Sequence, residues 1–397
     1  MEYCIATDND KEEIIEFINK VFEFPAKNLD FRTLIPKVYG DDKGVNEIHH
    51  LVKEDGKIAA VIAVYEREYR IGDRRLKTGY IGSVSVDADK RGKGYMKLLM
   101  KKAEEAMREK GISLAMLSGD RNRYGYFGYE VGGLRLKFEF EKRNITHTIG
   151  WGLDEVQLVQ INDTDGINDD IYSLYEKGRV CACMRDEFYE RSLTWDSILY
   201  AVKNGEKTMG YVVTSKDHYL VREIELNDWS FLLSVIRSLM IMGGKEQLVV
   251  YTLTWEYEKN MAMQQACEQY AILPACSYKV LDYKKTIEAL LALQMECGKV
   301  SDDIFTIEID GRCCYRIEVN DGNVQVNEIA YAKANKETAD NFRTVNIFET
   351  PDITVSGRAF ISAFMSPAYY LYEKKAKRAY PTGWLPFVFA PAIVDEF

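Results

Sequence analysis

The sequence lacks the features that mark several large classes of protein. No apolar run approaches the roughly 18 residues that a membrane-spanning helix needs, so we expect no membrane association. Basic residues are not in excess: 52 Lys and Arg stand against 62 Asp and Glu, a net charge of −10, which argues against a nucleic-acid partner. The first residues, 1–13, contain neither the basic segment nor the apolar run of a signal peptide, and we therefore expect a cytoplasmic protein.

Cysteine and histidine are also sparse where they would carry chemistry. The eight cysteines show no disulfide framework, and none of the four histidines lies near a cysteine at the spacing of a metal site, so we expect no metal. Cys181 and Cys183, like the pair Cys313-Cys314, are expected to be small buried apolar side chains. No Gly-x-Ser-x-Gly sequence occurs, which argues against a serine hydrolase.

The patterns that are present indicate an α/β chain with mixed sheets. At roughly 150 residues per domain, the chain has the length of two or three domains. A capping pattern at residues 10–13 precedes a helix, and apolar runs at 57–65 and 81–86 predict strands on either side of a turn at Gly72-Asp73. Apolar residues recur at helical spacing from Met96 to Met107, Gly111 ends that helix, and a strand is predicted over 112–117, with alternation at 134–140.

The remainder of the chain repeats this alternation. Paired strands are predicted at 206–214 and 219–226, followed by a helix over 229–242. Short strands at 304–309, 314–319 and 324–329 precede a helical stretch around 369–379. We place the domains at 1–149, 150–285 and 286–397.

The most informative segment is residues 84–96, where a strand ends, a short loop follows and a helix begins. Such a loop directs backbone N–H groups outward at the positive end of the helix dipole, and glycine lets a ligand approach the backbone. The window 90–102 contains no acidic residue but six basic ones, namely Lys90, Arg91, Lys93, Lys97, Lys101 and Lys102. This pattern predicts a pyrophosphate-binding loop, although a turn before a solvated helix face would show the same residues.

In its context, this loop resembles the acetyl-CoA loop of GCN5-related N-acetyltransferases (GNAT). Arg91-x-x-Gly94 follows the strand residues Val84-x-Val86 and precedes an amphipathic helix. Met96 stands where that family usually has Gly or Ala. The resemblance implies that acetyl-CoA is a cosubstrate bound by Val84, Val86, Arg91, Gly92, Lys93, Gly94, Tyr95 and Met96.

An aromatic segment downstream resembles a second element of the same family. Residues 124–129 read Tyr-Gly-Tyr-Phe-Gly-Tyr and follow the predicted strand 112–117. A tyrosine with a pKa near its reference value of about 10 is protonated at neutral pH, as a general acid must be. The resemblance implies this role for Tyr124, whereas packing is the default expectation for Tyr126 and Tyr129.

The tail, residues 380–397, combines three prolines with many large apolar side chains. Pro381, Pro386 and Pro391 exclude a helix. Burying each large apolar side chain stabilises a protein by roughly 1.5–3 kcal/mol, so we expect the tail to dock on the rest of the chain. A docked tail carries the terminal carboxylate of Phe397 to a fixed place.

Over its whole length the chain resembles the Eis-type acetyltransferases (enhanced intracellular survival family). The resemblance rests on Glu23-Phe24, residues 31–36, 84–96 and 124–129, and Glu396-Phe397. It implies a GNAT domain, a second degenerate GNAT-like domain and a sterol-carrier-protein-like domain, assembled as a homo-oligomer, a hexamer. It also implies that the Phe397 carboxylate enters the active site as the general base, and that the amine pocket is lined by Glu23, Phe24, Phe31 and Glu396.

The sequence therefore predicts an acetyl-CoA-dependent N-acetyltransferase that acts on a primary amine. Direct attack of the amine on the thioester needs no enzyme nucleophile, which agrees with the missing serine and cysteine motifs. Two alternatives stay open. The acetyltransferase domain could be vestigial in a non-catalytic protein that binds CoA or a lipid, and the amine could belong to a protein lysine rather than to an aminoglycoside or polyamine.

Overall fold

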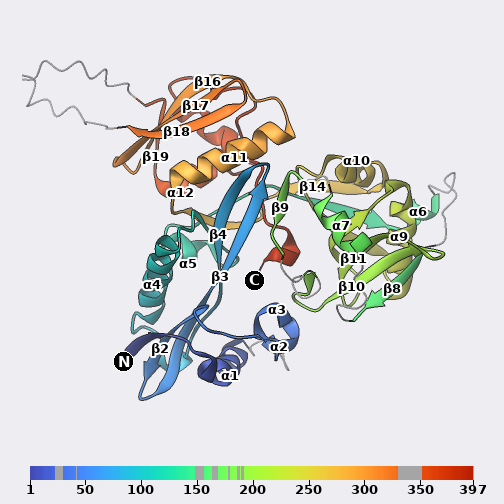
Figure 1. Ribbon diagram of the computed structural model, residues 1–397, viewed down its shortest axis with the longest axis horizontal. Coiled ribbons are helices and arrows are strands. Elements are labelled where there is room, and N and C mark those ends of the chain that lie inside the picture. The colour runs from blue at the N-terminus through green and yellow to red at the C-terminus, as the bar shows by residue number, and fades with distance from the viewer. Residues whose placement is uncertain are drawn as a thin grey trace, which may run out of the picture.

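The computed structural model describes residues 1–22, 30–41, 43–147, 156–162, 169–177, 179–185, 188, 192–329 and 351–396. They form an α/β fold built on three β-sheets with helices packed against them (Figure 1), which confirms the predicted fold class. Within these residues, no helix has the length and apolar character to cross a membrane.

The first sheet contains most of the N-terminal strands. In spatial order they are β1 (Glu2–Ile5), β2 (His49–Glu54), β3 (Lys57–Ile71), β4 (Arg74–Val86), β5 (Leu114–Leu117), β15 (Cys276–Val280) and β6 (Glu130–Gly132), with β9 (Cys181–Cys183) paired to β3. The predicted strands at 57–65, 81–86 and 112–117 are confirmed, and β3 and β4 are longer than predicted because they form one continuous hairpin closed at Gly72-Asp73.

The second sheet has the order β14 (Gln269–Leu273), β7 (Arg135–Glu141), β13 (Gln247–Leu253), β12 (Leu220–Leu226), β11 (Lys207–Ser215), β10 (Ser197–Asn204) and β8 (Gln157–Ile161). The strands predicted at 206–214 and 219–226 are confirmed. The helix predicted over 229–242 is a short 3₁₀ turn (Trp229–Phe231) continued by α9 (Leu232–Gly243). The other helices of this part are α6 (Lys142–His147), α7 (Asp169–Glu176) and α10 (Tyr257–Ala266).

Each of the first two sheets contains strands from the other's part of the chain, namely β9 and β15 in the first sheet and β7 in the second. Strand β15 lies between β5 and β6 of the first sheet, and β7 lies between β13 and β14 of the second. Strands β15 and β7 therefore occupy inner positions of these sheets. The division at residue 149 stays a prediction, but these two strands do not follow it, since β7 from the first range pairs in the second sheet and β15 from the second range pairs in the first.

Helices cover the two faces of the first sheet differently. Helix α4 (Tyr95–Glu109) packs on one face through Leu99, Met100, Ala103 and Met107, which confirms the predicted apolar stripe. The opposite face carries α1 (Lys11–Phe22), α2 (Phe31–Leu34) and α3 (Pro36–Tyr39), as Figure 1 shows. We call these the α4 face and the α1–α3 face.

The third sheet has the order β18 (Asn323–Ile329), β17 (Cys313–Asn320), β16 (Asp303–Ile309) and β19 (Ile353–Val355), and it packs with α11 (Tyr283–Cys297) and α12 (Gly357–Phe364). The three predicted strands are confirmed. The helical stretch predicted around 369–379 is present as a 3₁₀ helix over Tyr369–Lys375, which is shorter than predicted and has no buried side chain. A helix without a buried apolar face has little to stabilise it.

The tail docks as predicted. Trp384, Phe387 and Phe389 are buried, and the only helical turn in the described tail is the 3₁₀ segment Ile393–Asp395. The Trp384 Nε1–H donates to the Ser301 carbonyl (2.8 Å), and the Phe389 ring contacts the rings of Tyr69 and Trp255. In Figure 1 the red end of the chain lies between the first sheet and the second.

Candidate active site

Strands β4 and β5 separate close to the predicted ligand loop. Their parallel pairing ends at Ile81 and Leu117, and β4 continues to Val86 paired only with β3. The β3–β4 register shifts opposite Ser83, whose φ of 49° is unusual for a serine. Among the described residues, no strand pairs with this last part of β4 on the side of β5. Strand β5 ends at Leu117, and we call the unpaired edge of β4 beyond that point the opening between β4 and β5.

The loop after β4 presents the start of α4 at this opening. A 3₁₀ turn (Ala88–Lys90) leads to Gly92 and Gly94, whose φ angles of 82° and 84° belong to the left-handed region that favours glycine. A Cβ atom on either glycine would meet nothing within 4 Å, so the loop faces open space. The first backbone N–H groups of α4 have no partner within the helix and are available to an anion. The structure thus brings the predicted residues 84–96 together at one end of the opening.

In the folded chain an acidic side chain lies beside the basic residues of the segment 90–102. Glu54, at the end of β2, accepts hydrogen bonds from Lys90 (2.5 Å) and Lys93 (3.0 Å), and these bonds lower the pKa of the Glu54 carboxyl. Lys102 pairs with Glu105 on its own helix. Sequence reasoning missed Glu54 because it lies on a different strand, outside the window.

Tyr124 lies on the α4 face. It belongs to helix α5 (Arg121–Gly125), which begins where the Asp120 side chain accepts from the Arg123 N–H (2.7 Å). Its ring is buried in the apolar cluster that contains Tyr95 and Leu117, and burial raises the pKa of its hydroxyl. A Cβ at Gly119 would come within 2.4 Å of this ring, so glycine is needed there. The Tyr124 hydroxyl has no hydrogen-bond partner in the described part of the chain.

The other two tyrosines of this segment have different surroundings. Tyr126 is 71% exposed, and its ring contacts that of Phe127. Tyr129 is buried, which raises the pKa of its hydroxyl. Tyr129 thus shares the apolar cluster of Tyr124 and Tyr95, whereas Tyr126 lies at the surface.

Three buried polar side chains on the α1–α3 face are linked by hydrogen bonds that end at Ser83, where the β3–β4 register shifts. The Tyr39 hydroxyl lies 2.6 Å from Ser83 Oγ and 2.9 Å from His49 Nε2. Burial lowers the pKa of His49 to about 4, so its imidazole is neutral at pH 7. Sequence reasoning missed this chain, since the three residues lie on three separate elements and no spacing connects them.

Phe31 lies on the same face. Its side chain is buried, and its ring contacts those of Phe22, Tyr39 and Trp195 at centroid distances of 5.2, 5.8 and 6.1 Å. Trp195, which lies just before strand β10 of the second sheet, carried no signal in the sequence. Of the other predicted pocket residues, Glu23 and Phe24 lie outside the described residues.

The end of the tail reaches the point where β4 and β5 separate. The Glu396 carboxylate lies 3.4 Å from the hydroxyls of Tyr80 on β4 and Ser118 after β5, which are 2.6 Å apart from each other. Glu396 also forms an ion pair with the buried guanidinium of Arg135 on β7. One carboxylate oxygen is therefore already compensated by a cation. Phe397, the predicted source of the base, lies outside the described residues.

The opening is thus bordered by the loop and Tyr124 on the α4 face and by Phe31, Ser83 and Glu396 on the other. No group of three or more His, Cys, Asp and Glu side chains in the described ranges could hold a metal ion.

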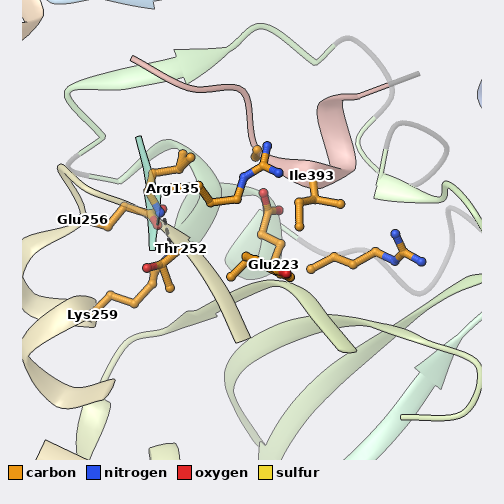
Figure 2. Close-up of a pocket in the computed structure, with 10 residues that line it drawn as sticks. Arg135, Glu223, Thr252, Glu256, Lys259 and Ile393 are labelled. Atoms are coloured by element: carbon orange, nitrogen blue, oxygen red, sulfur yellow. Dashed lines mark hydrogen bonds and ion pairs between the residues drawn. The ribbon is translucent and has the colours of Figure 1, made fainter. Parts of the chain in front are cut away.

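The second sheet has a similar opening, and the tail closes it. Strands β12 and β13 pair only at Leu220–Val249 and Val221–Val250 before they separate. The pocket beyond this point is lined by residues of both strands together with Arg135, Glu256, Lys259 and, from the tail, Ala392 and Ile393. Figure 2 shows this pocket, with Ile393 on one side and Glu256 and Lys259 on another.

Comparison with known families gives one match in the first part of the chain. Residues 2–132 match the family described as acetyltransferase (GNAT) domain. A comparison with curated protein sequences found no match.

Solved structures match over nearly the whole chain. A GCN5-related N-acetyltransferase from Anabaena variabilis has a TM-score of 0.67 at 12% identity and covers 100% of both chains. One from Kribbella flavida has a TM-score of 0.65 at 16% identity and covers 100% of this chain and 98% of its own. Eis1 from Mycobacterium abscessus has a TM-score of 0.61 at 12% identity and covers 97% of this chain and 95% of its own. At these identities the likeness concerns the fold.

Proposed function

We propose that this protein is an acetyl-CoA-dependent N-acetyltransferase of the Eis type that transfers an acetyl group directly to a primary amine. The observation that carries the proposal is the opening between β4 and β5, which has a glycine loop and a helix N-terminus on one face and the buried Tyr39–Ser83 hydrogen bond beside Phe31 on the other. A reaction between two bound molecules needs such an opening, accessible from both sides, because it brings the reacting atoms together.

The residues at the loop fit acetyl-CoA. The left-handed Gly92 and Gly94 leave open space where a side chain would stand, and the start of α4 offers N–H groups to a pyrophosphate. Arg91 and Lys93 supply positive charge, Tyr95 and Met96 begin the helix, and the backbone of Val84 and Val86 lines the opening. When bound there, acetyl-CoA supplies the thioester whose acetyl group is transferred.

Tyr124 is the proposed general acid. Burial raises the pKa of its hydroxyl above the usual value, so the group keeps its proton throughout the neutral range. As the new N–C bond forms and the C–S bond breaks, Tyr124 would give its proton to the departing thiolate sulfur. Its hydroxyl is not occupied by another hydrogen bond among the described residues, which leaves it available for this donation.

The terminal carboxylate of Phe397 is the proposed base. A protonated amine cannot attack a thioester, so a group near the opening must accept the ammonium proton. His49 is a poor candidate, because burial lowers the pKa of its imidazole to about 4 and its Nε2 is hydrogen-bonded to Tyr39. The Glu396 carboxylate is already engaged in an ion pair with Arg135. The resemblance to the Eis-type acetyltransferases supports the carboxylate of Phe397 in this role.

The amine is proposed to bind on the α1–α3 face. Phe31 offers an aromatic surface there, and Glu23, Phe24 and Glu396 complete the proposed pocket. Two structural neighbours are named GCN5-related N-acetyltransferases and a third is named Eis1, which supports the proposed activity.

Thiol release from acetyl-CoA tests the function. A panel of polyamines, aminoglycosides and lysine peptides is incubated with the protein, and free CoA is measured with a thiol reagent while mass spectrometry identifies the acetylated product. We expect turnover with at least one amine class and its loss in Tyr124→Phe. Tight CoA binding without turnover on any amine would instead favour the non-catalytic alternative.

A further inference from the structure

Three buried cations hold the last described residues of the tail. Lys37 Nζ donates to the carbonyl oxygens of Val394 (2.8 Å) and Glu396 (2.5 Å). The Arg185 guanidinium binds the carboxylate of Asp395, with Nε 2.9 Å from Oδ1. Arg135 pairs with the Glu396 carboxylate and donates to the Pro391 carbonyl (2.8 Å).

These cations come from parts of the chain that are far apart in sequence. Lys37 is on α3 of the first domain, Arg135 is on β7 in the second sheet, and Arg185 follows β9. Arg185 is in turn held by Glu223 on β12 through two hydrogen bonds of 2.8 and 2.7 Å. The tail is therefore bound from both sides, by Lys37 on one side and by Arg135 and Arg185 on the other. The second sheet contributes Arg135 and, through Glu223, holds Arg185 in place.

Lys37 differs from the two arginines because it contacts the main chain of the tail. Its side chain is 4% exposed, and in the described part of the chain no carboxylate oxygen lies within salt-bridge distance of Nζ. Burial lowers the pKa of Lys37 well below its usual range, and the charges of Arg67, Arg185 and Asp395 and the Cys183 thiol also act on it.

We propose that Lys37, assisted by Arg135 and Arg185, is a positioning residue that holds the tail so that its terminal carboxylate stays at the opening between β4 and β5. The role of the carboxylate in this inference rests on the proposed function. The binding of the tail by these three side chains, which we call the grip, does not depend on that function. Because Lys37 binds two carbonyls that flank Asp395, it fixes the direction of the main chain whatever side chains follow. The carboxylate of Phe397 is one residue beyond the second carbonyl.

The test compares Lys37→Met with Arg67→Met. Methionine is similar to lysine in length but cannot donate hydrogen bonds. Arg67 is a matched control, since it is also buried, acts electrostatically on Lys37 and stacks on Tyr65, yet it donates to the Glu66 carbonyl and not to the tail.

The first measurement is the rate at which carboxypeptidase A releases Phe397 from the folded full-length protein. We expect Lys37→Met to release it at least about tenfold faster than wild type and Arg67→Met to behave as wild type. Equal rates for Lys37→Met and wild type would overturn the grip. If Lys37→Met does not fold, Arg135→Gln tests the other side of the tail by the same measurement.

The second measurement separates the grip from the proposed function. In the thiol-release assay we expect kcat of Lys37→Met to fall by about 10²-fold, the lower end of the range for acid–base groups, with KM for acetyl-CoA unchanged within about twofold. Faster release of Phe397 with unchanged kcat would confirm the grip and reject the carboxylate as base. A parallel rise in KM for acetyl-CoA would show a general loss of structure and overturn the positioning role.

Discussion

At the scale of single residues, the proposed chemistry depends on burial more than on charge. Tyr124 and His49 are both buried near the opening, on opposite faces of the first sheet. Burial disfavours the charged form of each, so the tyrosine stays protonated and the histidine stays neutral. This difference makes the tyrosine suitable as a proton donor and the histidine unsuitable as a proton acceptor at neutral pH.

Replacing Tyr124 by Phe removes the proposed proton donor and keeps the ring. We expect kcat to fall by about 10²–10⁴-fold with little change in CoA affinity, since general acids contribute rate factors of that size. Steady-state kinetics and calorimetry give the two numbers. Tyr126→Phe is the matched control, because that hydroxyl belongs to an exposed side chain of the same segment. A Tyr124→Phe protein within about threefold of wild type would show that the thiolate leaves without this proton.

His49 gives a pH dependence of stability with a defined sign. Its pKa is about 4 in the folded protein, against about 6.5 for an unperturbed histidine. The folded state therefore binds fewer protons than the unfolded state between these values, and stability falls as the pH is lowered from 6.5 to 4. The loss through His49 is roughly 3 kcal/mol at pH 4.

Denaturant unfolding of wild type and His49→Gln across this pH range measures that contribution. Glutamine keeps a polar group toward Tyr39 and does not titrate, so we expect the variant to have a shallower slope of unfolding free energy against pH. Identical slopes for the two proteins would contradict a buried neutral His49.

At the scale of elements, the loop between β4 and α4 is the part on which acetyl-CoA binding depends. Gly94 is the residue before α4, and its left-handed φ is strained for any other residue. In Gly94→Glu the side chain also enters the open space and adds a negative charge beside the proposed pyrophosphate site. We expect calorimetry to detect no CoA binding.

Gly205→Glu separates ligand exclusion from backbone strain. Gly205 has a φ of 59° and equally open surroundings, but it lies in the turn between β10 and β11 of the second sheet. We expect this control to lose a similar amount of stability and to bind CoA normally. Micromolar CoA binding by Gly94→Glu would exclude the loop as the site.

The elements that sequence reasoning predicted are those with strong local signals. Alternating or continuous apolar runs predicted strands in all three sheets, and the glycines before a helical stripe predicted the loop 84–96. The helical stretch predicted at 369–379 forms only as a 3₁₀ helix over Tyr369–Lys375, because local periodicity cannot report that no side chain there is buried. The polar chain of Tyr39, Ser83 and His49 was not predictable either, since it depends on three separate elements meeting in space.

At the scale of the whole molecule, the first two sheets share strands, and the docked tail ends beside the opening between β4 and β5. The exchange of β7 and β15 was not predictable from the sequence, because a strand looks the same whichever sheet accepts it. Docking of the tail was predictable, since so much apolar surface must be buried. Which residues hold the tail was not, as Lys37 and Glu396 are 359 residues apart.

The central claim is that the end of the chain takes part in acetyl transfer within this opening. Adding Gly-Ser after Phe397 keeps every side chain but moves the free carboxylate away. The same two residues added before Met1, which is 74% exposed, are the control. The deciding measurement is kcat of the C-terminally extended protein in the thiol-release assay, recorded together with its Tm. The account predicts a fall in kcat of about 10²-fold or more with Tm unchanged within about 2 °C. Wild-type kcat in the extended protein would contradict it.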